Sequence, residues 1–92
     1  MGMSPKSIND RTPKEIEQLK ALGANIRKWR EKRGLTQEQF APVVGFTRSY
    51  ITGIETGKRN ISFLNLMKII LALEVTEEDW KTLISETKEA GA

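Results

Sequence analysis

The sequence contains no cysteine and no histidine. Disulfide bonds, zinc sites built from these two residue types, and catalysis by Ser–His or Cys–His pairs are therefore excluded. Long hydrophobic runs are also missing, because the longest, residues 69–73, is far shorter than a membrane span. Residues 1–15 lack the apolar region of a secretory signal, so we expect a cytoplasmic protein.

The formal net charge of +3 is small, but the charge is unevenly distributed. Residues 1–60 contain 12 Lys or Arg against 6 Asp or Glu, a net +6, whereas residues 61–92 contain 3 against 6, a net −3. A basic first part suits a polyanion such as DNA or RNA; the alternative is a solvated surface with chance clustering. A chain of 92 residues makes one domain, and so small a core gains from a partner subunit.

Helical patterns follow one another along the whole chain, and no stretch alternates like a strand. Each predicted helix starts after a Ser or Thr that can cap it, namely Thr12, Thr36, Thr47, Ser62 and Thr76. The pattern predicts an all-α fold of five helices. Residues 1–11 are expected to form a flexible tail, and residues 12–89 a single domain.

Two residues conflict with these helices. Gly23 interrupts the apolar stripe of the first helix, which is therefore either one long helix to about Lys32 or two pieces joined near Gly23. Pro42 lies inside the second helix and removes the hydrogen bond to the Glu38 carbonyl, so we expect a kink or a tightened end there.

The second and third predicted helices, at 36–44 and 47–56, are short and close together. Only Gly45 and Phe46 separate them. Two helices joined at a steep angle by a short turn that contains glycine have the helix-turn-helix geometry. A plain helical hairpin has the same spacing, so the pattern alone leaves both interpretations open.

More than half of the chain, from about Leu22 to Val75, resembles the lambda-repressor/Cro-like (XRE-type) helix-turn-helix family. The matching residues are Arg30, the Gly34-Leu35-Thr36-Gln37 start, Ala41, Gly45, and the IxxIExGKRN segment that begins at Ile51. The RSYITGIETGKRN stretch is most similar to restriction–modification controller proteins, although phage repressors, antitoxins and bacterial stress regulators share much of it. Pro42 and Glu74 depart from the family pattern, since Glu74 stands where glycine is usual.

The resemblance implies a five-helix lambda-repressor-like fold with an N-terminal helical extension and with residues 47–56 as the recognition helix. Arg48 would then donate two hydrogen bonds to guanine, and Gln37 would bind phosphate at the start of the second helix. For each residue the alternative is a solvated or merely packed side chain. The expected DNA-binding residues are Gln37, Thr47, Arg48, Ser49, Tyr50, Thr52, Gly53, Lys58, Arg59 and Asn60.

The family also pairs the positions of Arg30 and Glu55 in a partly buried salt bridge, which we expect here as a structural feature. The fourth helix is apolar nearly all round, with Phe63, Leu66, Ile69, Ile70 and Leu73 as its expected core stripe. A small core cannot hide every apolar side chain of the last two helices. We therefore expect a two-fold dimer surface; the alternative is that the fifth helix folds back on its own core. The expected dimer residues are Met67, Leu71, Trp80, Leu83 and Ile84.

The sequence thus predicts a regulator of transcription that binds a palindromic double-stranded DNA operator as a homodimer. The alternative is a protein-interaction module, such as an antitoxin, that keeps the fold and binds a protein partner. An enzyme is disfavoured, because no nucleophile–base pair, phosphate-cradling loop or metal cluster is present. We expect no cofactor and infer no small-molecule ligand. The sequence does not assign a role to residues 1–21.

Overall fold

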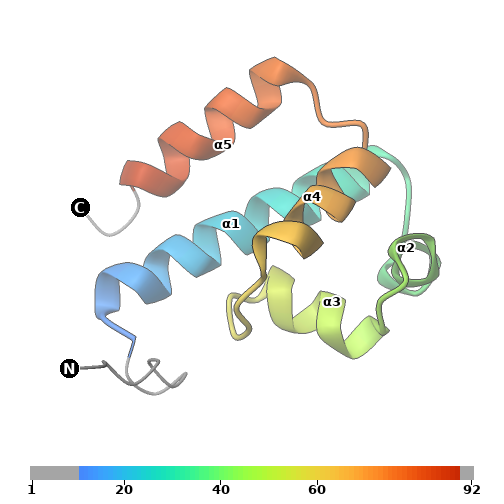
Figure 1. The fold of residues 1–92 in the computed structure, drawn as a ribbon, viewed down its shortest axis with the longest axis horizontal. Helices are drawn as coiled ribbons and strands as arrows, with labels where there is room; N and C mark the ends of the chain where they lie inside the picture. The colour runs from blue at the N-terminus through green and yellow to red at the C-terminus, as the bar shows by residue number, and fades with distance from the viewer. Residues whose placement is uncertain (1–10, 90–92) are drawn as a thin grey trace.

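Five helices make up most of the described chain (Figure 1). The computed structural model describes residues 11–89, apart from the side chains of residues 83, 84 and 86–89. The predicted tail therefore lies outside the described residues except for Arg11. The helices are α1 (Pro13–Lys32), α2 (Gln37–Val44), α3 (Arg48–Glu55), α4 (Phe63–Ala72) and α5 (Glu77–Glu89). The predicted all-α fold is confirmed, since these residues include no strand.

Each helix begins at the residue that the sequence predicts. The hydroxyls of Thr12, Thr36, Thr47 and Ser62 each accept a hydrogen bond from the backbone N–H three residues later. Thr76 does the same for the N–H of Asp79 at the start of α5. Each cap satisfies a backbone donor that the helix leaves free and stabilises the fold by about 1 kcal/mol. The caps thus fix where each helix begins.

Helix α1 lies at the centre of the fold. It contacts α3 on one side and α5 on the other, while α2 contacts α3 and α4 (Figure 1). Gly23 does not break it, because α1 runs without interruption over 20 residues. A Cβ atom at Gly23 would come within 2.2 Å of the Ile54 carbonyl oxygen. The glycine therefore permits direct contact between the backbones of α1 and α3.

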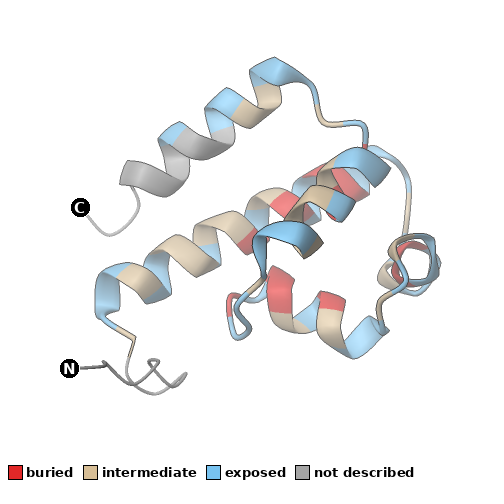
Figure 2. Cartoon of the chain, in the orientation of Figure 1, coloured by how far each residue is buried: buried red, intermediate tan, exposed pale blue. Residues whose placement is uncertain are grey.

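The core gathers where α1, α2, α3 and α4 meet (Figure 2). Phe40 and Ile51 are fully buried there, and Tyr50, Phe46 and Trp80 are partly buried against it. The expected burial of Phe63 is wrong, since its side chain is 74% exposed. Phe63 lies in the first turn of α4, at the edge of the inward-facing stripe, and packing against the core begins one turn later with Leu66.

Of the described helices, none is long and apolar enough to cross a membrane.

Pro42 is accommodated within α2, which continues to Val44. Gly45 follows in the left-handed conformation with a φ of 75°. Its N–H donates to the Pro42 carbonyl at 3.3 Å, an i to i−3 bond that tightens the last turn. The expected tightened end is therefore present, and it turns the chain toward α3.

The end of α4 combines a strained residue with an arginine cap. Glu74 has a φ of 51°, which makes it the one residue other than glycine with positive φ among those described. Arg33, from the end of α1, donates through Nε to the Leu73 carbonyl at 2.7 Å and through an Nη to the Glu74 carbonyl at 2.9 Å. The guanidinium satisfies carbonyls that the helix end leaves free.

The Gly23→Ala substitution should destabilise the protein, although alanine favours helix. The added methyl meets backbone oxygens that cannot move aside, so we expect the free energy of unfolding to fall by about 2 kcal/mol. Urea denaturation measures this, with Ala24→Gly as the control for helix propensity alone. A stability gain in Gly23→Ala would contradict the close backbone contact.

Replacing Glu74 by glycine should stabilise the protein by about 1 kcal/mol, because glycine adopts positive φ without steric cost. Thermal unfolding would show a higher Tm. The control is Glu74→Ala, which removes the carboxylate but keeps a Cβ and should give no such gain. Equal effects of the two substitutions would show that charge, and not backbone conformation, is responsible.

Candidate nucleic-acid interface

One open hollow collects most of the predicted DNA-binding residues. It lies along α3 and the turn that follows. Arg48, Ser49 and Thr52 are exposed on the helix, and Lys58 and Arg59 are exposed on the turn. The full set of lining residues is Arg48, Ser49, Thr52, Gly53, Thr56, Lys58 and Arg59. Three cationic side chains and three hydroxyls therefore border a concave surface that suits a polyanion.

The loop after α3 is held against the helix by backbone hydrogen bonds. The N–H groups of Lys58 and Arg59 both donate to the Gly53 carbonyl, at 2.9 and 3.1 Å. A Cβ at Gly53 would lie 2.6 Å from the Arg59 Cγ. The guanidinium of Arg59 lies 6.0 Å from the centre of the Tyr50 ring. Gly53 thus makes room for the Arg59 stem, which holds this cation beside α3.

Arg48 is paired with a carboxylate that the sequence analysis did not single out. Its Nε lies 2.9 Å from an Oε of Glu38 on α2, and both side chains are more than half exposed. A hydrogen bond from its own backbone N–H and the charge of Arg48 lower the pKa of Glu38 below its ordinary value. An ion pair this exposed is worth little to stability, so Arg48 can exchange Glu38 for another partner.

Other predicted residues have different surroundings. Thr47 caps α3 through its hydroxyl. Tyr50 is half-buried, packs edge-on against Phe46 with ring centres 4.9 Å apart, and accepts a hydrogen bond from the Asn65 Nδ2 at 2.9 Å. Asn60 lies not in the α3 hollow but in a second one along α1, beside Leu19 and Leu22.

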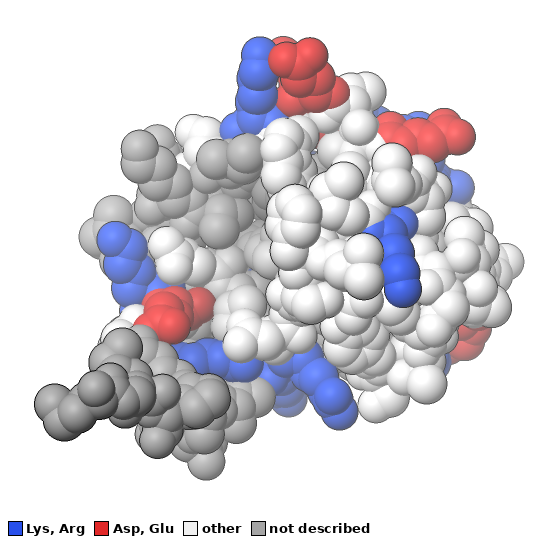
Figure 3. Space-filling model, viewed as in Figure 1, with Lys and Arg blue, Asp and Glu red and all other residues white. Residues whose placement is uncertain are grey.

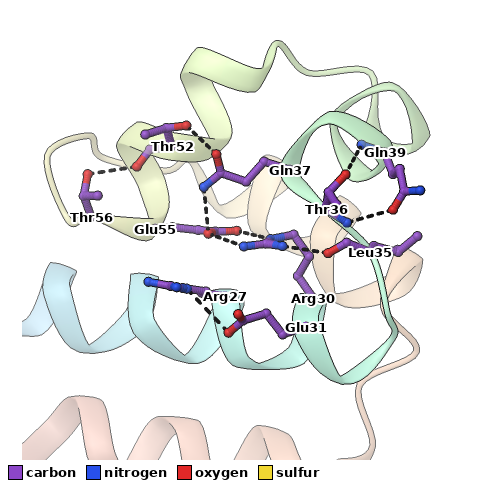
Figure 4. Close-up of polar contacts among 10 residues, drawn as sticks. All are labelled: Arg27, Arg30, Glu31, Leu35, Thr36, Gln37, Gln39, Thr52, Glu55 and Thr56. Atoms are coloured by element: carbon purple, nitrogen blue, oxygen red, sulfur yellow. Dashed lines mark hydrogen bonds and ion pairs between the residues drawn. The ribbon is translucent and has the colours of Figure 1, made fainter.

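The expected salt bridge is buried between α1 and α3 (Figure 4). Arg30 donates through Nε to one Glu55 oxygen at 2.7 Å and through an Nη to the other at 3.0 Å. A third donor nitrogen of Arg30 reaches the Leu35 carbonyl at 2.6 Å. The hydrogen bond to Glu55 raises the pKa of Arg30 above its ordinary value. The pair locks the end of α3 to α1.

Gln37 is half-buried and extends this network from Glu55 toward the surface. Its Nε2 donates to Glu55 at 3.0 Å, and its Oε1 accepts from the Thr52 hydroxyl at 2.8 Å. The sequence assigned Gln37 to phosphate binding, but both polar ends of its side chain are used inside the protein. The Gln37 NH₂ group carries two hydrogens, one of which goes to Glu55. A phosphate contact by Gln37 would therefore come from the second hydrogen of Nε2 or from its backbone N–H at the start of α2.

The predicted dimer residues lie in different environments. Leu71 is 70% exposed and Met67 is half-buried. Trp80 is half-buried and packs against its own core, as the alternative of a folded-back α5 requires. The side chains of Leu83 and Ile84 lie outside the described residues. Two exposed apolar residues that were not predicted for this surface, Phe63 and Leu64, lie on α4 and are 74% and 65% exposed.

Arg30→Met should lower the free energy of unfolding by about 3–5 kcal/mol, because it leaves the Glu55 carboxylate buried without its cation. Chemical denaturation measures the loss. The matched control replaces Arg30 and Glu55 together by methionine and should recover most of the stability, since no charge is then stranded. If the free energy of unfolding of Arg30→Met were within about 1 kcal/mol of the wild-type value, the importance of the pair would be contradicted.

Comparison with known proteins agrees with this geometry. A sequence profile of the Helix-turn-helix family matches residues 26–80. An uncharacterised HTH-type transcriptional regulator of Sinorhizobium fredii is 32% identical over 78% of this chain and 94% of its own length. The control protein C.MunI from a Mycoplasma species is 46% identical over 60% of this chain and 76% of its own length.

Solved structures show the same fold. The restriction–modification controller C.AhdI of Aeromonas hydrophila has a TM-score of 0.62 and 38% identity, over 66% of this chain and 92% of that one. The controller C.Esp1396I, solved as a tetramer in complex with its natural 35 base-pair operator, has a TM-score of 0.67 and 34% identity, over 78% of this chain and 96% of that one. The chain therefore belongs to the Helix-turn-helix family.

Proposed function

We propose that this protein is a sequence-specific regulator of transcription that binds duplex DNA as a homodimer in the cytoplasm. The observation that carries the proposal is the exposed hollow along α3, which gathers Arg48, Ser49, Thr52, Lys58 and Arg59. The related controller solved on its operator supports DNA over a protein partner. The family's recognition helix corresponds to α3, which would enter the major groove with its first residues facing base edges.

The residues of the hollow divide between two roles. Arg48 opens α3 and would leave Glu38 to donate two hydrogen bonds to O6 and N7 of a guanine. Lys58 and Arg59 lie on the turn and would contact phosphates, which position the protein without reading sequence. Ser49 and the Tyr50 hydroxyl are further candidates for either role.

The dimer would form through α4. Phe63, Leu64, Met67 and Leu71 lie on one side of this helix, beside the stripe that faces the core. Figure 3 shows few charged side chains over the face on which α4 lies. A second copy of the chain is the occupant that fits, because a two-fold axis pairs such a stripe with itself and sets two recognition helices about 34 Å apart on one face of DNA.

The test is selection of bound duplexes from a random pool. We expect a palindromic consensus with two half-sites, and binding that weakens steeply with salt as counterions are released. Unrestricted binding of all sequences, or no binding to DNA, would contradict the proposal. Size-exclusion chromatography with light scattering, applied to wild type and to Leu64→Glu, tests the α4 dimer.

Arg48→Ala and Arg59→Ala should act differently. Loss of Arg48 should cost about 1–3 kcal/mol and relax the preference at one base pair in each half-site. Loss of Arg59 should weaken binding to all sequences alike and reduce the salt slope by about 1. Titration by fluorescence anisotropy measures both, with Lys81→Ala on α5 as the charge-matched control. An unchanged base preference in Arg48→Ala would remove it from the recognition role.

A further inference from the structure

A chain of four polar side chains runs from the core to the exposed face of α3 (Figure 4). Arg30 and Glu55 form its buried end. Gln37 connects Glu55 to Thr52, through hydrogen bonds of 3.0 and 2.8 Å. Thr52 is exposed and borders the hollow along α3. The buried ion pair is therefore connected, through Gln37, to a side chain that borders the hollow along α3.

The chemistry of the buried pair fixes the direction of every hydrogen bond in this chain. A guanidinium only donates, and a carboxylate only accepts. Gln37 must therefore turn its NH₂ group toward Glu55, since its carbonyl oxygen would be repelled there. That leaves the carbonyl oxygen of Gln37 facing Thr52. Because this oxygen can only accept, the Thr52 hydroxyl must donate its one hydrogen to it.

The direction of that last bond limits what Thr52 can offer to a ligand. A hydroxyl has one hydrogen and two acceptor lone pairs. With its hydrogen held by Gln37, Thr52 presents only lone pairs to the hollow. A free threonine can rotate its hydroxyl to suit either a donor or an acceptor. Toward a ligand, the Thr52 hydroxyl can therefore act only as a hydrogen-bond acceptor.

We propose that Thr52 is a specificity-determining residue that selects an exocyclic amino group on the base it faces. The inference rests on the proposed function, with α3 in the major groove. Adenine N6 and cytosine N4 are the amino groups exposed there, whereas guanine O6 and thymine O4 are acceptors. Thr52 therefore favours adenine or cytosine over guanine or thymine on the strand it faces. Gln37 acts as the positioning residue that sets this polarity.

The first experiment compares selected DNA pools of wild type, Thr52→Val and Thr52→Ser. Valine keeps the shape of threonine and removes the hydroxyl, so one position in each half-site should lose its preference. Serine keeps the hydroxyl and should retain the preference. At that position wild type should bind adenine or cytosine roughly threefold to tenfold more tightly than guanine or thymine, the range expected of one hydrogen bond.

The second variant tests the polarity itself. Gln37→Met keeps the length of the side chain but removes the acceptor for the Thr52 hydroxyl. The hydroxyl can then donate as well as accept, so the preference should relax although Thr52 is unchanged. Gln39→Met is the matched control, because Gln39 lies on the same helix and its side chain accepts a hydrogen bond from the Thr36 backbone N–H, away from Thr52. Thermal unfolding establishes that each variant is folded.

The outcomes separate this inference from the proposed function. A wild type that selects a palindrome while Thr52→Val and Gln37→Met keep the same base preferences overturns the acceptor role alone. A Thr52-dependent preference for guanine or thymine also overturns it, because the polarity would be reversed. Failure of the wild type to discriminate among sequences overturns the proposed function together with this role.

Discussion

The buried ion pair between Arg30 and Glu55 is the interaction on which the rest of the structure depends. It joins α1, the central helix, to the last turn of α3, and both side chains are almost completely removed from water. Isolated charges are very costly in such a place, and this pair is tolerated because both ends have hydrogen-bond partners. Arg30 also reaches the loop before α2 through the Leu35 carbonyl. One guanidinium thereby holds three segments in register.

The pair also organises the exposed face of α3. Glu55 accepts from Gln37, which brings the start of α2 against α3. Glu38, the next residue, is then near enough to pair with Arg48. The two short helices are therefore linked by two polar contacts, the hydrogen bond from Gln37 to Glu55 beneath the surface and the exposed ion pair of Glu38 with Arg48. Their relative orientation decides which side chains can reach a ligand together.

Much of the fold could be predicted from the sequence because its causes are local. Ser and Thr caps and helical spacing located the starts of all five helices, and the three glycines with positive φ mark turns. Whether Gly23 broke α1 could not be decided, since the answer depends on contact with the distant Ile54 carbonyl. Phe63 was misplaced because helical periodicity gives the face of a residue but not where the core ends along the helix axis.

The candidate site could also be predicted only in part from the sequence. Residues of α3 and its turn were found because they are consecutive and share the family pattern. The partners of Arg48 and Thr52 were missed, since both lie on α2 and meet α3 only in three dimensions. An acidic residue in the first turn of α2 was a visible signal for Glu38, but it has the equally simple interpretation of a favourable helix-dipole charge.

The bare backbone at Gly23 has a consequence for how this protein can vary. Where two helices are separated by side chains, exchanging large residues for small ones changes their spacing. Here α1 and α3 meet atom to atom at the main chain, so their separation is set by van der Waals radii and not by side-chain volume. Core residues elsewhere can be replaced by larger or smaller ones, with effects on stability, while the distance between α1 and α3 stays the same.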